Sequence, residues 1–175
     1  MAKIITKKST KAPLLRIKFL SHGTLESRDL QASRRFYEEV LGLEVIQHLP
    51  HALTIRHGSN HTYVVVHSNK PKEMNVLNHN GLDVGTEEEV RAAYEILRSV
   101  QQEYGIRKIS KPGKLHGYYA FMFQDMDANW WEILVNSSGG YSGLFDKPEN
   151  DLTNRSVGAP KPASPRDGHR IGDVC

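Results

Sequence analysis

Three side chains that can bind a metal ion stand where a shared site would need them. His22 begins the stretch 22–29, His79 begins a second, weaker copy of that stretch, and Glu132 closes the stretch 125–132. Two imidazoles and one carboxylate that leave coordination positions open to substrate form the facial triad of non-haem Fe(II) and related divalent-metal enzymes. We therefore interpret His22, His79 and Glu132 as metal ligands, with Fe(II) as the first choice and Mn(II) as the second.

The surroundings of the two histidines repeat, because His79 follows His22 by 57 residues and the same offset places Asp29 on Thr86. Asp and Thr are both favourable helix N-caps, so a helix is expected to begin after each of them. Apolar residues at helical spacing then predict helices over about 30–41 and 87–104, each ended by a glycine. Internal self-similarity of this kind indicates two copies of one structural module.

Short apolar runs with strand character follow each predicted helix, separated by turn residues such as Pro50 and the pair Pro112-Gly113. With a first strand at each histidine, the element order is βαβββ twice. We therefore predict the α+β class, with two βαβββ modules that form a half-barrel around one metal site. The later strands are expected at 43–47, 52–56 and 62–67, and again at 106–109, 118–124 and 131–135.

The modules are predicted to occupy residues 14–68 and 74–136, with an N-terminal arm at 1–13 and a C-terminal extension at 137–175. The extension is rich in Pro, Gly, Asp and Arg and has few apolar anchors, which is typical of a mobile segment. We expect it to become ordered across a partner chain or over the mouth of the site. The predicted assembly is a homodimer, which would cover the open edges of the curved sheets.

The ligand positions and the paired modules resemble the vicinal oxygen chelate superfamily, which includes glyoxalases, extradiol dioxygenases, fosfomycin resistance proteins and epimerases. The resemblance covers residues 14–136. It implies that the two modules curl around one metal ion bound by His22, His79 and Glu132. Related proteins often complete their sites by forming dimers.

Two features depart from the family pattern. In the turn before the last strand, Met126 and Ala128 replace the Pro and Gly of the usual Asp-Pro-Asp-Gly, although Asp and Asn still favour a turn there. Glyoxalase I uses a fourth, acidic ligand on the last strand of its first module, where this chain has only His61 and His67. We interpret both as solvated strand ends. Three ligands therefore fit dioxygenases and fosfomycin transferases better than glyoxalase I.

The resemblance is closest to one-domain extradiol dioxygenases, which cleave a catechol-like ring with O₂ at Fe(II). Chelation of the diol requires that its hydroxyls lose protons, and a nearby His can accept them. His116, just upstream of the last predicted strand, is the candidate base, and Tyr118 or Tyr119 is the candidate to orient the oxygen species. The family's own Tyr falls at Met122 or Phe123 and is missing.

A ring substrate needs apolar and aromatic walls. Phe121, Phe123 and Trp130 are the candidate substrate-binding residues because they lie near the site in sequence. Side chains alternate along a strand, so Trp130 shares a face with Glu132 and Trp131 does not. The predicted substrate is a small aromatic or oxygen-chelating molecule, together with O₂.

Other chemistries stay open at this point. A metal-dependent lyase, isomerase or epimerase would use the metal as a Lewis acid and would need no O₂. Thiol transfer of the fosfomycin type would need a cationic pocket, for which Arg16 and Lys18 are the nearest basic residues in sequence. A binding protein of the bleomycin-resistance kind would have lost its metal, and the intact triad argues against it.

The composition excludes several classes of function. The chain of 175 residues has a net charge of +3, which is spread and predicts no nucleic acid partner. No apolar run approaches the length of a membrane span, and residues 1–9 lack the apolar core of a signal peptide. The single cysteine, Cys175, cannot form an internal disulfide, which fits a reducing cytoplasm.

Overall fold

The computed structural model describes residues 4–58, 61–136, 140–146 and 148–153. The chain divides into two compact units, Arg16–Ser137 and the two terminal segments. In the terminal unit, the described residues form two short 3-10 turns, Gly140–Leu144 and Pro148–Asn150. Much of the predicted C-terminal extension therefore lies outside the described residues. None of the described helices is long and apolar enough to span a membrane.

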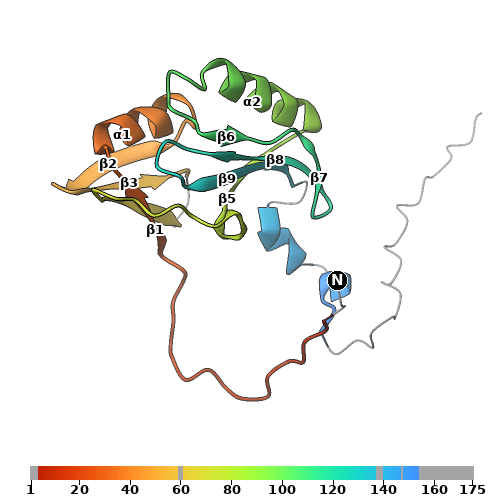
Figure 1. The fold of residues 1–175 in the computed structure, drawn as a ribbon. Helices are drawn as coiled ribbons and strands as arrows, with labels where there is room; N and C mark the ends of the chain where they lie inside the picture. Colours follow the sequence, from red (N-terminus) through yellow and green to blue (C-terminus); the bar gives the residue numbers. More distant parts are fainter. Residues whose placement is uncertain (1–3, 59–60, 137–139, 147, 154–175) are drawn as a thin grey trace, which may run out of the picture. The chain divides into compact units, whose positions relative to one another are not determined.

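The unit Arg16–Ser137 contains two mixed sheets with one helix each, as the repeat predicts (Figure 1). The strand order is β1-β4-β3-β2 in the first sheet and β5-β9-β8-β6 in the second, where β7 pairs with β8. The first module consists of β1 (His22–Ser27), α1 (Leu30–Glu39), β2 (Glu44–Leu49), β3 (Ala52–Arg56) and β4 (Thr62–His67). The second consists of β5 (Asn80–Val84), α2 (Glu87–Ser99), β6 (Lys108–Ile109), β7 (Gly113–Leu115), β8 (Tyr118–Gln124) and β9 (Trp130–Val135).

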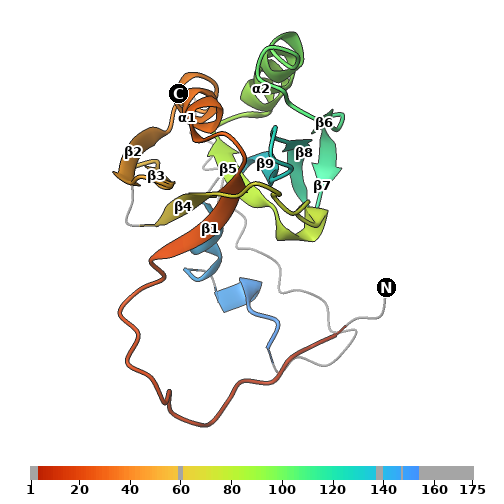
Figure 2. The same cartoon turned by 60° about the vertical axis from the view of Figure 1, so that its left-hand side comes forward.

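The α+β class with paired βαβββ modules is thus confirmed, and the sheets remain open rather than closed into a barrel. Figures 1 and 2 show α1 and α2 on the same side of the two sheets. The strands β1 and β5 are the outer strands of their sheets, and each pairs with only one neighbour, β4 and β9 respectively. Among the described strands, each sheet therefore has an open edge at the strand that begins at His22 or directly after His79.

Local chemistry explains where the helices begin and end. Asp29 caps α1 by accepting hydrogen bonds from the backbone N–H groups of Gln31 and Ala32. Thr86 and Glu89 form a capping box at the start of α2. Both helices are shorter than predicted, because the residues after Glu39 and Ser99 turn away to Gly42 and Gly105, each with φ of +65°. Pro112-Gly113 was expected to be only a turn, yet Gly113 begins the short strand β7.

The hydrophobic core joins the two modules. On α1, Phe36 packs 6.4 Å from the ring of Phe123, and Tyr37 packs 5.9 Å from the ring of Trp131. All four of these aromatic side chains are buried. Since α1 belongs to the first module and β8 and β9 to the second, neither module buries its apolar face alone.

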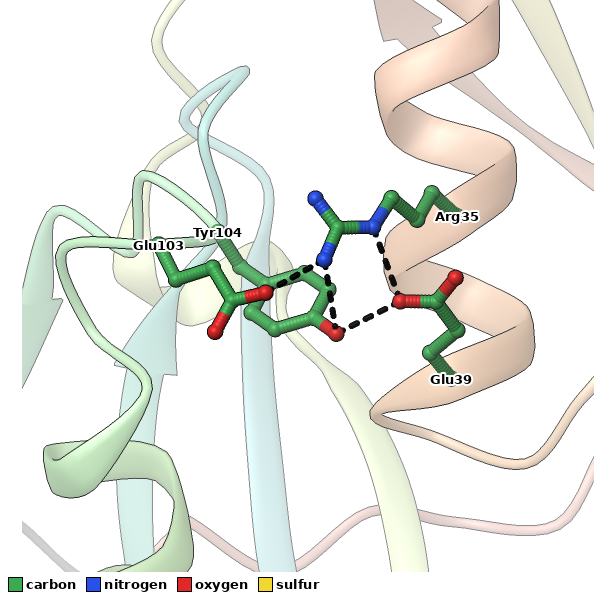
Figure 3. Close-up of polar contacts among 4 residues, drawn as sticks. All are labelled: Arg35, Glu39, Glu103 and Tyr104. Atoms are coloured by element: carbon green, nitrogen blue, oxygen red, sulfur yellow. Dashed lines mark hydrogen bonds and ion pairs between the residues drawn. The ribbon is translucent and has the colours of Figure 1, made fainter.

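A surface network ties the modules together at the other side of α1 (Figure 3). Arg35 on α1 donates to Glu39 of the same helix and to Glu103, which follows α2. Its guanidinium also lies 4.6 Å from the centre of the Tyr104 ring, and the Tyr104 hydroxyl donates to Glu39 at 2.6 Å. The neighbouring carboxylates raise the pKa of Arg35. Exposed ion pairs contribute little stability, so the core carries most of the energy of this junction.

Candidate metal centre

His79 and Glu132 lie side by side. The Nε2 atom of His79 is 3.3 Å from Oε2 of Glu132. Glu132 is 3 % exposed, and among the described residues its one polar partner is this imidazole. A buried carboxylate with a single partner is costly unless a cation balances its charge. The pair therefore offers two of the usual ligands of a divalent metal ion, and a bound cation would balance the charge of the buried carboxylate.

The orientation of the His79 ring is set by the backbone before it. Its Nδ1 atom lies 2.7 Å from the carbonyl oxygen of Val76, in the 3-10 turn Val76–Asn78. A carbonyl only accepts, so Nδ1 carries the hydrogen and Nε2 is the atom that faces Glu132. Metal-ligating histidines usually donate their other ring N–H to a carbonyl or carboxylate in this way. The pair thus fits a divalent cation bound through Nε2 of His79 and the Glu132 carboxylate.

His22 does not join this pair within one chain. Among the described residues, no three His, Cys, Asp or Glu side chains gather closely enough to hold one metal ion. His22 is exposed at the start of β1, and its Nδ1 atom lies 2.8 Å from Oγ of Ser21. Since Leu25 and Ser27 are buried, strand alternation turns His22 to the side of its sheet away from the helices. Glu132 also faces away from the helices, because its neighbour Trp131 packs under α1.

The register of β8 against β9 decides which aromatic residues face Glu132. Met122 lies directly opposite Glu132, so Met122 and Glu132 share a face. Phe121 and Phe123 point to the opposite face and are fully buried in the core, Phe121 5.6 Å from the ring of Tyr94 on α2. These two predicted substrate-binding residues therefore lie in the core and not on the face of Glu132. Trp130 does share the face of Glu132, opposite Gln124, and is half-buried.

The three predicted catalytic residues come from one hairpin. His116 and Gly117 form the two-residue turn between β7 and β8, with φ of 53° and 95°. The turn is exposed. By strand alternation Tyr118 shares the face of Met122 and Glu132, whereas Tyr119 faces α2, where the guanidinium of Arg91 lies 4.7 Å from its ring centre. Of the two tyrosines, only Tyr118 is on the side of the metal half-site.

A small cavity between the modules contains residues that the sequence interpretation did not select. It has a volume of about 170 Å³, and its lining includes His61, Tyr63, Gly81 and Trp131. The Tyr63 ring lies 5.2 Å from that of His61 and 6.3 Å from that of Trp131, and burial raises the pKa of its hydroxyl. In the sequence, Tyr63 shares strand parity with the apolar Val65, and this shared parity is the signal that could have indicated an inward position. On the adjacent strand, a Cβ at Gly23 would come within 2.5 Å of the Tyr63 ring.

A larger cavity, of about 660 Å³, opens beside the start of α1. Its lining includes Arg28, Arg34, His51 and His67, and none of the predicted site residues. Cavity size therefore does not mark the metal half-site, whose carboxylate is buried.

The turn that carries β9 to its place is a buried polar network. The carboxylate of Asp125 accepts hydrogen bonds from the backbone N–H groups of Asp127 and Asn129 and from Nε1 of Trp131. Asp127 in turn accepts from the backbone N–H of Arg28 and from the hydroxyl of Ser33, both in the first module. Burial nevertheless raises the pKa of Asp125 to about 6. The turn thus fixes Glu132 relative to the first module.

Ala128 in this turn has a φ of 70° and is buried. This is the left-handed region, which costs a residue with a Cβ about 1–2 kcal/mol and costs glycine nothing comparable. We predict that Ala128→Gly raises the free energy of unfolding by about 1 kcal/mol, measured by urea denaturation. Ala92→Gly in the exposed part of α2 is the control and should lower it by a similar amount. An unchanged or lower stability of Ala128→Gly would contradict the claim that the backbone at Ala128 is strained.

Comparisons with known proteins agree with this architecture. Residues 20–133 match the model of the Glyoxalase/Bleomycin resistance protein/Dioxygenase superfamily. No curated protein matches the chain. Among solved structures, a hypothetical protein from S. aureus is 26 % identical with a TM-score of 0.53, covering 69 % of this chain and 98 % of its own.

Two further solved structures share the fold at lower identity. A lactoylglutathione lyase from Agrobacterium tumefaciens is 17 % identical with a TM-score of 0.53, covering 71 % of this chain and 98 % of its own. A genomically encoded fosfomycin resistance protein from Listeria monocytogenes is 20 % identical with a TM-score of 0.57, covering 69 % of this chain and 95 % of its own. The family model spans most of the chain and both modules. The chain therefore belongs to the glyoxalase/bleomycin resistance protein/dioxygenase superfamily.

Proposed function

We propose that this protein is a divalent-metal-dependent enzyme that acts on a small molecule able to chelate a metal through two neighbouring oxygens. The observation that carries the proposal is the pair of His79 and buried Glu132, with the imidazole held by the Val76 carbonyl. Two imidazoles and a carboxylate suit Fe(II) or Mn(II). Such an ion, when bound, polarises the chelated oxygens as a Lewis acid.

The third ligand in this proposal is His22 from the second chain of a homodimer. Within one chain His22 stands apart from the pair, yet it lies on the helix-free side of its sheet, as Glu132 does on its own sheet. Both outer strands, β1 and β5, have open edges. A two-fold dimer would use the same pair of surfaces twice and would complete two equivalent sites.

Ring cleavage of a catechol-like substrate with O₂ is the first candidate reaction. Tyr118 and half-buried Trp130 share the face of Glu132, and they offer one hydroxyl and one aromatic wall beside the half-site. His116 stands at the end of the same hairpin and is the candidate to accept the hydroxyl proton. The test is oxygen uptake by protein loaded with Fe(II) under anaerobic conditions and then given a panel of catechols. Oxygen consumption with a ring-opened product supports this reaction.

A lyase, isomerase or epimerase reaction at the same metal is the second candidate. The specific observation in its favour is that the tyrosine of the dioxygenase pattern, which falls at Met122 or Phe123, is missing, and that Met122 lies directly opposite Glu132. Lewis-acid chemistry does not need that hydroxyl. Absence of oxygen uptake with every catechol, combined with stoichiometric binding of a divalent metal, would favour this candidate. Failure to bind any divalent metal would contradict both.

The role of His116 has its own prediction. Asn adopts positive φ readily in two-residue hairpin turns, so His116→Asn should keep the turn and the melting temperature. We expect turnover to fall about 100-fold, the lower end of what a general base contributes, with metal content unchanged. Lys114→Ala, in the neighbouring strand of the same hairpin, is the control and should keep full turnover. A fully active His116→Asn variant would leave His116 as a turn residue only.

A further inference from the structure

The cavity of about 660 Å³ beside the start of α1 has a basic lining. Arg28 and Arg34 contribute two guanidinium groups, and His51 and His67 contribute two imidazoles. The lining also contains one acid, Asp29, and a single oxygen of its carboxylate caps α1 by accepting from two backbone N–H groups. Two permanently charged guanidinium groups against one carboxylate leave a positive excess, and the imidazoles add further hydrogen-bond donors. Such a lining favours an anionic ligand.

The two histidines form a cross-strand pair at the end of the first sheet. The register of β3 against β4 continues to His51 and His67, and the backbone N–H of His67 donates to the His51 carbonyl at 2.9 Å. Their Cβ atoms are therefore about 5 Å apart. Both histidines share strand parity with the buried Leu53 and Val65, so they lie on the face of the sheet that α1 covers. Neither imidazole makes a hydrogen bond or ion pair with a described residue.

The two arginines complete the cavity from the side of α1. Arg34 is held in place, because its guanidinium donates to Glu38 at 2.9 Å and to the Val45 carbonyl at 3.2 Å. Arg28 precedes α1 and donates its backbone N–H to Asp127 at 2.9 Å, whereas its guanidinium has no hydrogen bond or ion pair with any described residue. All the side-chain donors of Arg28 are therefore available to a ligand.

We propose that this cavity binds a small phosphorylated organic molecule, whose phosphate contacts Arg28 and the pair of His51 and His67. A phosphate monoester offers three acceptor oxygens and up to two negative charges. A carboxylate has only two oxygens, which one guanidinium can satisfy alone, so three separate donor groups fit phosphate better.

The rest of the cavity suits an organic group on that phosphate. Its volume lies within the range of small-molecule sites, about 300–1,000 Å³. The lining beyond the basic groups is partly apolar and includes Leu30, Pro50 and Leu53. The cavity lies on the helix-covered face of the first sheet, whereas Glu132 lies on the helix-free face of the second. Binding of the phosphate is therefore separate from binding of a metal ion by His79 and Glu132.

The first test measures the binding of phenyl phosphate, inorganic phosphate and phenol by isothermal titration calorimetry. Phenyl phosphate should bind at one site per chain, inorganic phosphate should bind more weakly, and phenol should not bind. Arg28→Gln should weaken the binding of phenyl phosphate about 10-fold or more, because it removes a charge-assisted hydrogen bond. Arg56→Gln is the matched control, since Arg56 is an exposed arginine on β3 outside this lining, and it should keep the wild-type affinity.

Two results of this titration would overturn the proposal. One is the absence of binding at about 10 mM phenyl phosphate, ten times a dissociation constant of 1 mM. The other is an unchanged affinity in Arg28→Gln. Equal affinities for phenyl phosphate and inorganic phosphate would overturn the assignment of an organic ligand.

The second test locates the phosphate on the wild-type protein by nuclear magnetic resonance. The ring signals of His51 and His67 should shift together during a titration with phenyl phosphate. The ring signals of His48, which bonds to Thr54 outside this lining, should stay in place. Glu132→Gln should bind phenyl phosphate as tightly as the wild type. Loss of binding in Glu132→Gln, or shifts at His79 without shifts at the histidine pair, would place the phosphate at the metal half-site and overturn the proposal.

Discussion

Mixing the variants His22→Ala and His79→Ala should restore about a quarter of the wild-type metal sites, although neither variant alone should hold the metal. Random exchange makes half of the dimers mixed, and each mixed dimer has one intact site of two. That site takes His79 and Glu132 from the first variant and His22 from the second. The measurement is metal content by elemental analysis after chain exchange and removal of free ions. Loss of a ligand from a three-ligand site should lower affinity at least about 100-fold, since removal of even a supporting group costs 10–100-fold.

The control for this experiment is built into the same set of residues. A mixture of His79→Ala and Glu132→Gln should restore nothing, because every possible pair of these two ligands then contains a defect. A mixture of His22→Ala and Glu132→Gln should restore as much as the first mixture. If all three ligands come from one chain, no mixture restores metal. Full metal content in His22→Ala alone would remove His22 from the site.

The second large effect, a loss of folding stability, is expected for a substitution in the turn before β9. Asp125→Ala removes the acceptor for the Trp131 indole N–H and for the Asn129 backbone and side-chain donors, all buried. Each stranded donor costs about 1–3 kcal/mol, so we expect the free energy of unfolding to fall by about 4 kcal/mol at pH 4.5. Urea denaturation monitored by tryptophan fluorescence measures it. Glu95→Ala on the exposed face of α2 is the control, with a change within about 0.5 kcal/mol.

This loss should depend on pH with a definite sign. Burial raises the pKa of Asp125 from 3.8 to about 6. The folded chain therefore holds the proton more tightly than the unfolded chain, so the stabilisation is complete below pH 4 and decreases as the pH rises through 6. The difference between the two pKa values corresponds to about 3 kcal/mol. The difference in the free energy of unfolding between wild type and Asp125→Ala should therefore decrease by up to that amount between pH 4 and pH 7. A gap that widens with pH would contradict the raised pKa.

Much of the fold follows from local chemistry that a sequence displays. Asp29 and Thr86 cap the two helices as predicted, because capping depends on residues within one turn. The bounds of β3, β4 and β8 agree with the predicted strands. The helix ends were less predictable, since the last turns before Gly42 and Gly105 depend on how each helix packs on its sheet.

The candidate site was harder to predict because it depends on the register of β8 against β9 and on the assembly of two chains. Alternation along β8 separates Phe121 and Phe123 from Met122, but only the pairing of Met122 with Glu132 says which set faces the metal half-site. That pairing is a contact between two strands, so the sequence of either strand alone does not predict it. His79 and Glu132 lie 3.3 Å apart in the structure, and their role as metal ligands stays a prediction. The position of His22 stays a prediction, because a ligand supplied by a second chain is invisible in one chain.

The close approach of Gly23 to the Tyr63 ring also constrains how the protein can be changed. A side chain at position 23 would meet the ring at 2.5 Å, and the ring has little room to move because it packs between His61 and Trp131. Positions 23 and 63 therefore form one unit for mutagenesis, and a larger residue at 23 is acceptable only together with a smaller one at 63. A library that varies the two positions separately would discard nearly every useful reshaping of the cavity between the modules, whereas a paired library would retain it.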